Sequence, residues 1–315
     1  MQAISTLNEL VNKVAKETLE QYSDINLQAS ELSISLIDLS NLSNKAKSAN
    51  HKDKNPSSHK LEPLSIAHFH GEEPTYPASI VKLFYLVATQ QWLEDKKITE
   101  TDEIKRASTD MIVNSSNDAT AYIIDVLTNT TGGPELPLPE MASWIEKRNT
   151  INKYFQSLGY KNINVNQKTW GDGSYGRERV FVGKEYENRN KLTSNATAKL
   201  LAEIATGRCI SKERSNAMLA LLARDFTQVS DDVDNQATGF MGSCLPKDAK
   251  LWSKAGWMST VRHDAAYIEL ANGISFVLVV FITNHAKDYW ILPTIAKKII
   301  HGLEFHHGVA HSKLQ

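Results

Sequence analysis

The sequence lacks the features of disulfide-stabilised, membrane-spanning or nucleic-acid-binding chains. Its only two cysteines, Cys209 and Cys244, are too few for a disulfide framework and fit free thiols in a reducing compartment. No apolar run approaches the roughly 20 residues that a membrane-spanning helix needs. The formal net charge of -1 argues against a dedicated nucleic-acid binder. What remains is an ordinary globular composition, 41% hydrophobic and 23% charged.

The first ten residues also lack a basic flank followed by an apolar core, so we do not expect them to form a secretory signal peptide. If Met1 is the natural start, we expect the protein in the cytoplasm. The length of 315 residues suffices for one large domain or two closely packed ones. Nothing in the sequence indicates an oligomeric state.

Hydrophobic periodicity predicts strands near both ends of the chain and helices between them. The expected elements are a helix over 7–22, strands over 31–38 and 64–69, helices from 79 to about 226 with an irregular tract over 159–195, strands over 250–254, 264–270 and 274–282, and a helix over 290–303. Asn272-Gly273 is a strong hairpin signal between the last two strands.

This order predicts an α/β (α+β) fold of two domains. Residues 1–70 and 227–315 would build a discontinuous domain with an antiparallel five-stranded sheet flanked by the terminal helices. Residues 71–226 would form an inserted all-helical domain. We expect an active-site cleft between the two domains.

Ser79 and Lys82 mark the start of an apolar helix that follows Pro77, a residue suited to a first helical turn. Residues three apart share one helix face, so the hydroxyl and the amine would lie side by side. A serine at a helix start also feels the positive end of the helix dipole. This pair can make a nucleophile, although such a spacing also arises by chance.

Two later segments carry polar residues in similar settings. Ser115-Ser116-Asn117 interrupts a helical stretch, where a plain helix N-cap is the simpler interpretation. Lys254-Ala255-Gly256 ends a short strand, and its small residues would let a substrate or another backbone approach closely. A lysine at a strand end is more often an ordinary surface residue.

Taken in order, the three segments resemble the signatures of class A β-lactamases and penicillin-binding proteins: Ser-x-x-Lys at Ser79–Lys82, Ser-x-Asn at Ser115–Asn117, and Lys-x-Gly at Lys254–Gly256. The expected order of elements resembles that fold too. The resemblance covers nearly the whole chain.

The resemblance implies a role for each matching residue. Ser79 would be the acylated nucleophile, activated by Lys82 directly or through water, with Ser115 passing a proton to the leaving nitrogen. Asn117 would hold Lys82 and the substrate amide, and Lys254 would attract a substrate carboxylate. The backbone N–H groups of Ser79 and Trp257, next to Gly256, would form the oxyanion hole. Arg262 could be a second carboxylate anchor or a plain surface arginine.

The sequence also departs from the family pattern. Ser116 stands where the family usually has aspartate, and Ala255 stands where it normally has a hydroxyl residue. Class A enzymes place a glutamate in a loop before the helix that would start here at Thr193, and the usual loop motif is absent. Glu178 has the most suitable spacing for that deacylating base, and Glu185 and Glu187 lie in the same region. A glutamate in such a region is more often a solvated carboxylate than a catalytic base.

Two other patterns look like sites and are not expected to be. Residues 171–176 match Gly-x-Gly-x-x-Gly, but neither a βαβ unit nor a helix start after it is expected. The pairs His68/His70 and His306/His307 lack completing metal ligands. We therefore expect no cofactor and no metal.

The sequence thus predicts a serine hydrolase of the β-lactamase-like superfamily, acting through an acyl-enzyme on Ser79. Its partner would be a small-molecule amide, ester or β-lactam that bears a carboxylate. One alternative is a glutaminase-like amidase of the same superfamily, which also uses Ser-x-x-Lys; Lys254-Ala255-Gly256 argues against it. The other is a non-catalytic penicillin-binding-like protein without deacylation. Turnover of antibiotics is doubtful without a clear loop glutamate.

Overall fold

One antiparallel sheet organises the computed structural model, which describes residues 6–41, 64–170, 173–228 and 230–314. Its strand order is β2-β1-β6-β5-β4-β3. The strands are β1 (Leu32–Asp38), β2 (Ala67–Phe69), β3 (Ala223–Arg224), β4 (Lys250–Met258), β5 (Val261–Glu269) and β6 (Ser275–Thr283). The predicted fold class is confirmed, but the predicted count of five strands is wrong. The strand that was missed, β3, has two residues and is too short to show any alternation.

The hairpin between β5 and β6 forms where Asn272-Gly273 predicted it. Leu270 N–H donates to the Ile274 carbonyl at 2.8 Å, and Gly273 has a φ of +92°. Strands β4 and β5 extend past their predicted ends and pair from Lys250↔Glu269 to Met258↔Val261. Polar residues such as Arg262 interrupt the apolar pattern there, which hid those strand ends in the sequence.

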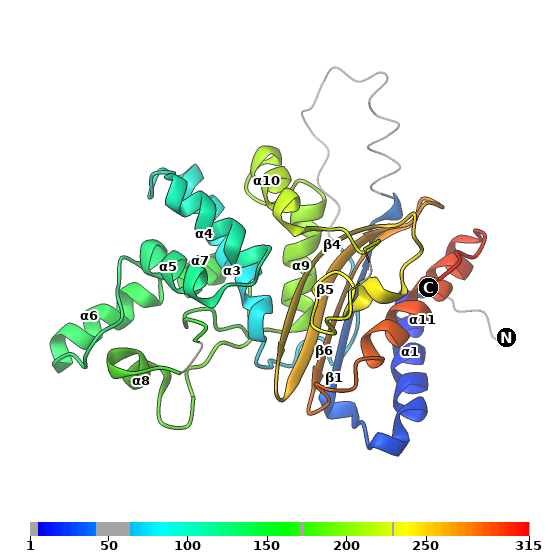
Figure 1. Ribbon diagram of the computed structural model, residues 1–315, viewed down its shortest axis with the longest axis horizontal. Coiled ribbons are helices and arrows are strands. Elements are labelled where there is room, and N and C mark those ends of the chain that lie inside the picture. The colour runs from blue at the N-terminus through cyan, green and yellow to red at the C-terminus, as the bar shows by residue number, and fades with distance from the viewer. Residues whose placement is uncertain (1–5, 42–63, 171–172, 229, 315) are drawn as a thin grey trace.

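Helices cover both faces of the sheet (Figure 1). On one face lie α1 (Leu7–Gln21) and α11 (Ile291–His307), which contact each other so closely that a Cβ on Gly302 would lie 2.1 Å from Leu10 Cδ1. On the other face, α9 (Ser194–Ala205) packs against β1, β5 and β6. The sheet is therefore the middle layer of three.

The remaining helices gather beyond α9, away from α1 and α11 (Figure 1). They are α3 (Lys82–Glu94), α4 (Asp102–Ile112), α5 (Asn117–Thr128), α6 (Leu138–Arg148), α7 (Thr150–Ser157), α8 (Gly176–Val182) and α10 (Lys212–Leu222). Helix α3 is buried around its whole circumference, as a central helix must be. The division into two domains stays a prediction.

Helix α8 corrects one expectation. Residues 159–195 were predicted to be irregular, and no helix was expected after residues 171–176. A short helix nevertheless begins at Gly176, whose φ of +53° is a conformation that glycine adopts without strain. Gly171 and Asp172 lie outside the described residues, as does nearly all of the polar connection that was expected over 41–60. All described strand pairs are antiparallel, which excludes a parallel βαβ unit among them.

Two further observations concern the described residues as a whole. None of their helices combines the length and the apolar character needed to cross a membrane. Cys209 and Cys244 are both buried free thiols.

Candidate active site

Ser79 lies in a tight turn that leads into the central helix. A 3-10 turn, η3 (Ala78–Val81), precedes α3, so the regular helix begins at Lys82 and not at Ser79 as predicted. Ala78 holds a φ of +46°, which is unusual for a residue with a side chain. Ser79 is half-buried, and its hydroxyl has no hydrogen-bond partner within the described part of the chain.

Lys82 is buried beneath the turn and points at the start of α5. Its Nζ donates to the Ser115 carbonyl at 2.5 Å and to Asn117 Oδ1 at 2.9 Å, and lies 3.3 Å from Ser115 Oγ. Burial lowers the pKa of Lys82 to about 7, because the charged amine is costly to remove from water. Near neutral pH a large fraction of this amine is therefore free base.

The Ser115–Asn117 segment combines the two interpretations that its sequence allowed. Ser116 is the N-cap of α5, and its hydroxyl accepts from Ala119 N–H at 3.1 Å. The residues on either side of the cap, Ser115 and Asn117, both contact Lys82. Ser115 has a φ of +55°, which turns the chain sharply before the cap. Asn117 Nδ2 donates to the Trp170 carbonyl at 3.2 Å, which ties this helix start to the following loop.

Lys254 reaches the same point from strand β4. Its Nζ donates to Ser115 Oγ at 3.0 Å, to Gln236 Oε1 at 2.5 Å and to the Ala255 carbonyl at 2.8 Å. Complete burial holds the pKa of Lys254 well below its usual value, and the charge of Lys82 lowers it further. The Ser115 hydroxyl thus lies between two buried amines.

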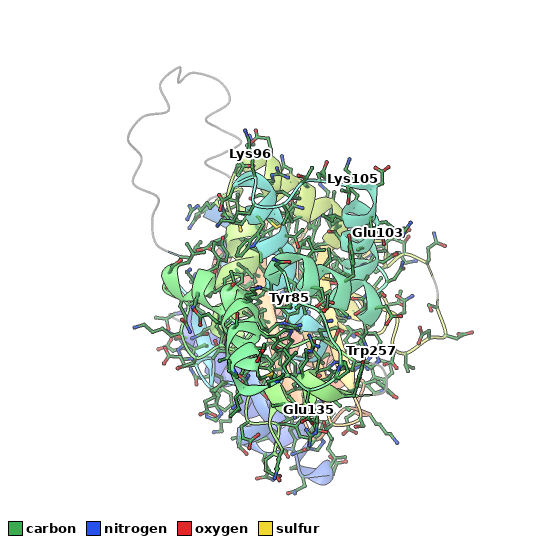
Figure 2. All side chains as sticks on the ribbon, turned by 90° about the vertical axis from the view of Figure 1, so that its left-hand side faces the viewer. Tyr85, Lys96, Glu103, Lys105, Glu135 and Trp257 are labelled. Atoms are coloured by element: carbon green, nitrogen blue, oxygen red, sulfur yellow. The ribbon has the colours of Figure 1, made fainter. Side chains whose placement is uncertain are left out.

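Gly256 brings β4 against the serine turn. A Cβ at this position would lie 2.8 Å from the Pro77 carbonyl oxygen and 2.9 Å from the backbone nitrogens of Ser79 and Ile80. Only glycine fits at such a distance from rigid backbone. Trp257 follows at one side of the molecule when it is viewed from the helices, with Tyr85 of α3 at the centre (Figure 2). Segments around residues 79, 115 and 254 therefore meet in one place.

A comparison with protein families assigns the chain to a family. The model described as the β-lactamase enzyme family matches residues 59–301, which is more than half of the chain. The chain belongs to the β-lactamase enzyme family. The predicted superfamily is therefore confirmed. No curated protein matches the sequence.

Several solved structures share the fold of this family member. A β-lactamase from Sphaerobacter thermophilus is 16% identical, with 95% of this chain and 99% of that chain covered and a TM-score of 0.64. PBP-A is 16% identical over 93% and 96% of the two chains, with a TM-score of 0.60. A class A β-lactamase from Bacteroides cellulosilyticus is 13% identical over 93% and 98%, with a TM-score of 0.61. At such identities the likeness shows the fold.

Arg262, a candidate carboxylate anchor, is not brought to this cluster. It pairs with Trp257 in the β4–β5 register, and side chains alternate along a strand, so it lies on the sheet face opposite Lys254. Its guanidinium is 1% exposed and donates to Asp234 at 2.7 Å and to the Val233 and Gly239 carbonyls at 2.6 Å each. These contacts hold the loop before β4.

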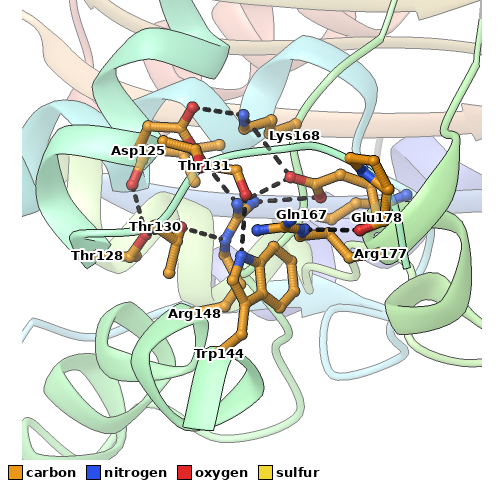
Figure 3. A network of polar contacts seen from close by, with 12 residues as sticks. Asp125, Thr128, Thr130, Thr131, Trp144, Arg148, Gln167, Lys168, Arg177 and Glu178 are labelled. Atoms are coloured by element: carbon orange, nitrogen blue, oxygen red, sulfur yellow. Dashed lines mark hydrogen bonds and ion pairs between the residues drawn. The ribbon is translucent and has the colours of Figure 1, made fainter. Parts of the chain in front are cut away.

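Glu178 is also engaged elsewhere, in a buried network beneath α8 (Figure 3). Its carboxylate accepts two hydrogen bonds from Arg148, at 2.8 and 3.3 Å, and lies 3.6 Å from Lys168 Nζ. Arg148 also pairs with Asp125 and stacks on the Trp144 ring. None of the contacts found for Glu178 among the described residues reaches Ser79, Lys82 or Ser115. The other two candidates, Glu185 and Glu187, are exposed.

Two contributors to the cluster were missed by the sequence interpretation. Gln236 touches Lys254 from the loop before η4 (Met241–Cys244), and the Trp170 carbonyl touches Asn117. Both lie in segments without periodicity, and one of the two acts through its backbone, so no pattern could mark them. As for metals, no group of three or more His, Cys, Asp or Glu side chains in the described ranges could hold an ion.

Proposed function

We propose that the protein is a serine hydrolase that forms an acyl-enzyme on Ser79 with an amide, ester or β-lactam bearing a carboxylate. The observation that carries this proposal is the position of Ser115 Oγ, 3.3 Å from Lys82 Nζ and 3.0 Å from Lys254 Nζ. A hydroxyl between two amines of lowered pKa can relay a proton between them and a leaving group. Membership of the β-lactamase enzyme family supports the same reaction class.

Acylation would begin with the free base of Lys82. It takes the proton of Ser79 Oγ, and the oxygen attacks the substrate carbonyl carbon to give a tetrahedral oxyanion. The N–H groups of Ser79 and Trp257 would donate to that oxyanion, an assignment supported by the close approach of Gly256 to the Ser79 nitrogen. The leaving nitrogen takes a proton from Ser115, which recovers one from Lys82 as the C–N bond breaks.

Lys254 would bind the substrate carboxylate. A cation with a depressed pKa gains a partner charge when the carboxylate arrives, so binding stabilises its protonated form. Ala255 supplies no hydroxyl to this subsite, and its methyl group is buried on the sheet face opposite Lys254.

Slow deacylation is the second proposal, and it favours a penicillin-binding-like response to lactams. The Glu178 carboxylate is neutralised by Arg148 and Lys168, so it is poorly placed to be a free base. An acyl-enzyme without such a base persists. The glutaminase-like alternative has no observation of its own in its favour.

Intact mass after incubation with a labelled penicillin tests acylation. We expect a stable adduct that is absent from Ser79→Ala, and slow or no hydrolysis of a chromogenic cephalosporin. Failure of every lactam, ester and glutamine probe to modify Ser79 would refute the proposal that the protein is a serine hydrolase.

The same assay tests Glu178 separately. If Glu178 is the base, Glu178→Gln slows deacylation and spares acylation. If its role is structural, Glu178→Gln leaves the ratio of the two rates unchanged and lowers the melting temperature, because Arg148 loses a charged partner.

A further inference from the structure

Gln236 occupies a position on Lys254 that the proposed substrate would need. Its Oε1 accepts from Lys254 Nζ at 2.5 Å, while its Nε2 donates to the Val113 carbonyl at 2.8 Å. Val113 is the C-cap residue of α4, so the glutamine side chain spans from the loop before η4 to the helices. It therefore bridges two of the segments that surround the cluster.

Lys254 has no spare donor in this arrangement. An ammonium group has three N–H donors, and three acceptors are in place: Ser115 Oγ, Gln236 Oε1 and the Ala255 carbonyl. The Ala255 carbonyl belongs to the strand itself, and Ser115 is held by the turn before α5. Ser115 Oγ and Gln236 Oε1 both come from half-buried side chains on connecting segments, but Ser115 Oγ also contacts Lys82 Nζ at 3.3 Å. Gln236 is therefore the acceptor whose release leaves the contact between the two lysines and Ser115 in place.

The loop is built to present Gln236 at this point. On one side, Asp234 is fixed by the buried Arg262 guanidinium at 2.7 Å. In between, Asn235 Oδ1 accepts from the N–H groups of Ala237 at 2.9 Å and Thr238 at 3.1 Å. The neighbours of Gln236 are therefore anchored by contacts that do not involve Lys254.

We propose that Gln236 is a specificity-determining gate whose amide oxygen stands in for a carboxylate on Lys254 until a carboxylate-bearing substrate displaces it. The gate deepens the proposed function and rests on it. A carboxylate carries a full charge where the amide offers a dipole, so exchange gives Lys254 a charge-assisted hydrogen bond. Ligands without a carboxylate cannot make this exchange. Because a carboxylate must first displace the Gln236 amide, it binds more weakly than it would to a Lys254 without that contact.

Binding to Ser79→Ala protein isolates the gate from acylation. Isothermal titration compares benzylpenicillin with its methyl ester, which lacks the charge. We expect Gln236→Ala, added to Ser79→Ala, to raise the affinity for benzylpenicillin about tenfold relative to the ester. The reason is that the carboxylate no longer has to displace the Gln236 amide oxygen from Lys254. Gln236→Glu should weaken benzylpenicillin, since the introduced carboxylate stays paired with Lys254.

Two controls make the outcome decisive. In a Lys254→Met background the gain from Gln236→Ala should vanish, and Gln156→Ala, at an exposed glutamine on α7, should give no gain. No gain, an equal gain for the ester, or a gain that survives Lys254→Met would each overturn the gate. Because nothing here requires acylation, these results are independent of whether Ser79 forms an adduct.

Discussion

At the scale of single residues, the main feature of the cluster is a pair of buried amines that contact one hydroxyl group. Lys82 and Lys254 both have lowered pKa values because burial disfavours their charged forms, and each contacts Ser115. Two ammonium ions this close would repel each other, so the site favours states with fewer protons. The chemistry of Ser79 thus depends on how many protons this group of residues holds.

Acylation should follow the ionisation of Lys82. Its pKa of about 7 means that the free base, which accepts the Ser79 proton, grows as pH rises through 7. We expect the acylation rate constant to rise about tenfold per pH unit below 7 and to level off above it, measured by stopped-flow with a reporter lactam. Lys82→Arg, which stays protonated, should remove acylation by a factor of about 100 or more. A flat profile between pH 5 and 8 would exclude Lys82 as the base.

The sequence indicated those residues of the cluster that lie in a recognisable motif, and it missed the others. The Ser79, Ser115 and Lys254 segments each carry a short signature, and the structure brings Lys82, Ser115, Asn117 and Lys254 into direct contact. Gln236 and Trp170 follow no pattern because loop geometry alone puts them there. Arg262 and Glu178 could not be judged from sequence, since a charged side chain looks the same whether it faces a cleft or a buried partner.

Among the elements, the junction between strand β4 and turn η3 controls the geometry of the cluster. The strand carries Lys254 and the turn carries Ser79, and Gly256 lets their backbones meet. The strand was predicted to be short, and the turn was predicted to be regular helix. Both differences lie at this junction, where close backbone packing decides the local conformation and periodicity does not.

Gly256→Ala should disrupt this junction. The added methyl group would lie under 3 Å from three backbone atoms, so β4 and η3 must separate. We expect acylation to fall about 100-fold or more through loss of oxyanion donors, with a loss of about 1–3 kcal/mol of stability. Gly132→Ala is the matched control, because its Cβ would have nearest neighbours at 3.8 Å or more. Normal acylation by Gly256→Ala would contradict the proposed close fit.

Considered as a whole, the molecule depends on the packing of its two ends. Helices α1 and α11, at opposite ends of the described chain, lie side by side on one sheet face (Figure 1). Amphipathic patterns and the antiparallel strands predicted this layer well. The sequence did not reveal that α9 covers the opposite face, because a helix pattern does not say which surface it packs on.

Gly302→Leu should weaken this contact. Leu10 is 2% exposed and already lies where a Cβ on Gly302 would project. Overpacking should lower stability by about 1–3 kcal/mol, partly offset by the better helix propensity of leucine. Denaturant unfolding measures the change, with His306→Ala at an exposed site of α11 as the control. Unchanged stability in Gly302→Leu would show that α1 and α11 can move apart at little cost.

The meeting of β4 with the turn before α3 has a further consequence, for how the chain acquires its structure. Lys82 and Lys254 share Ser115 although most of the chain separates them, and contacts of such long range close late in folding. Partly folded forms would hold native helices and lack a reactive serine. A labelled penicillin added during refolding would then modify only fully folded molecules. The rate at which label is incorporated would therefore report the rate of the final folding step.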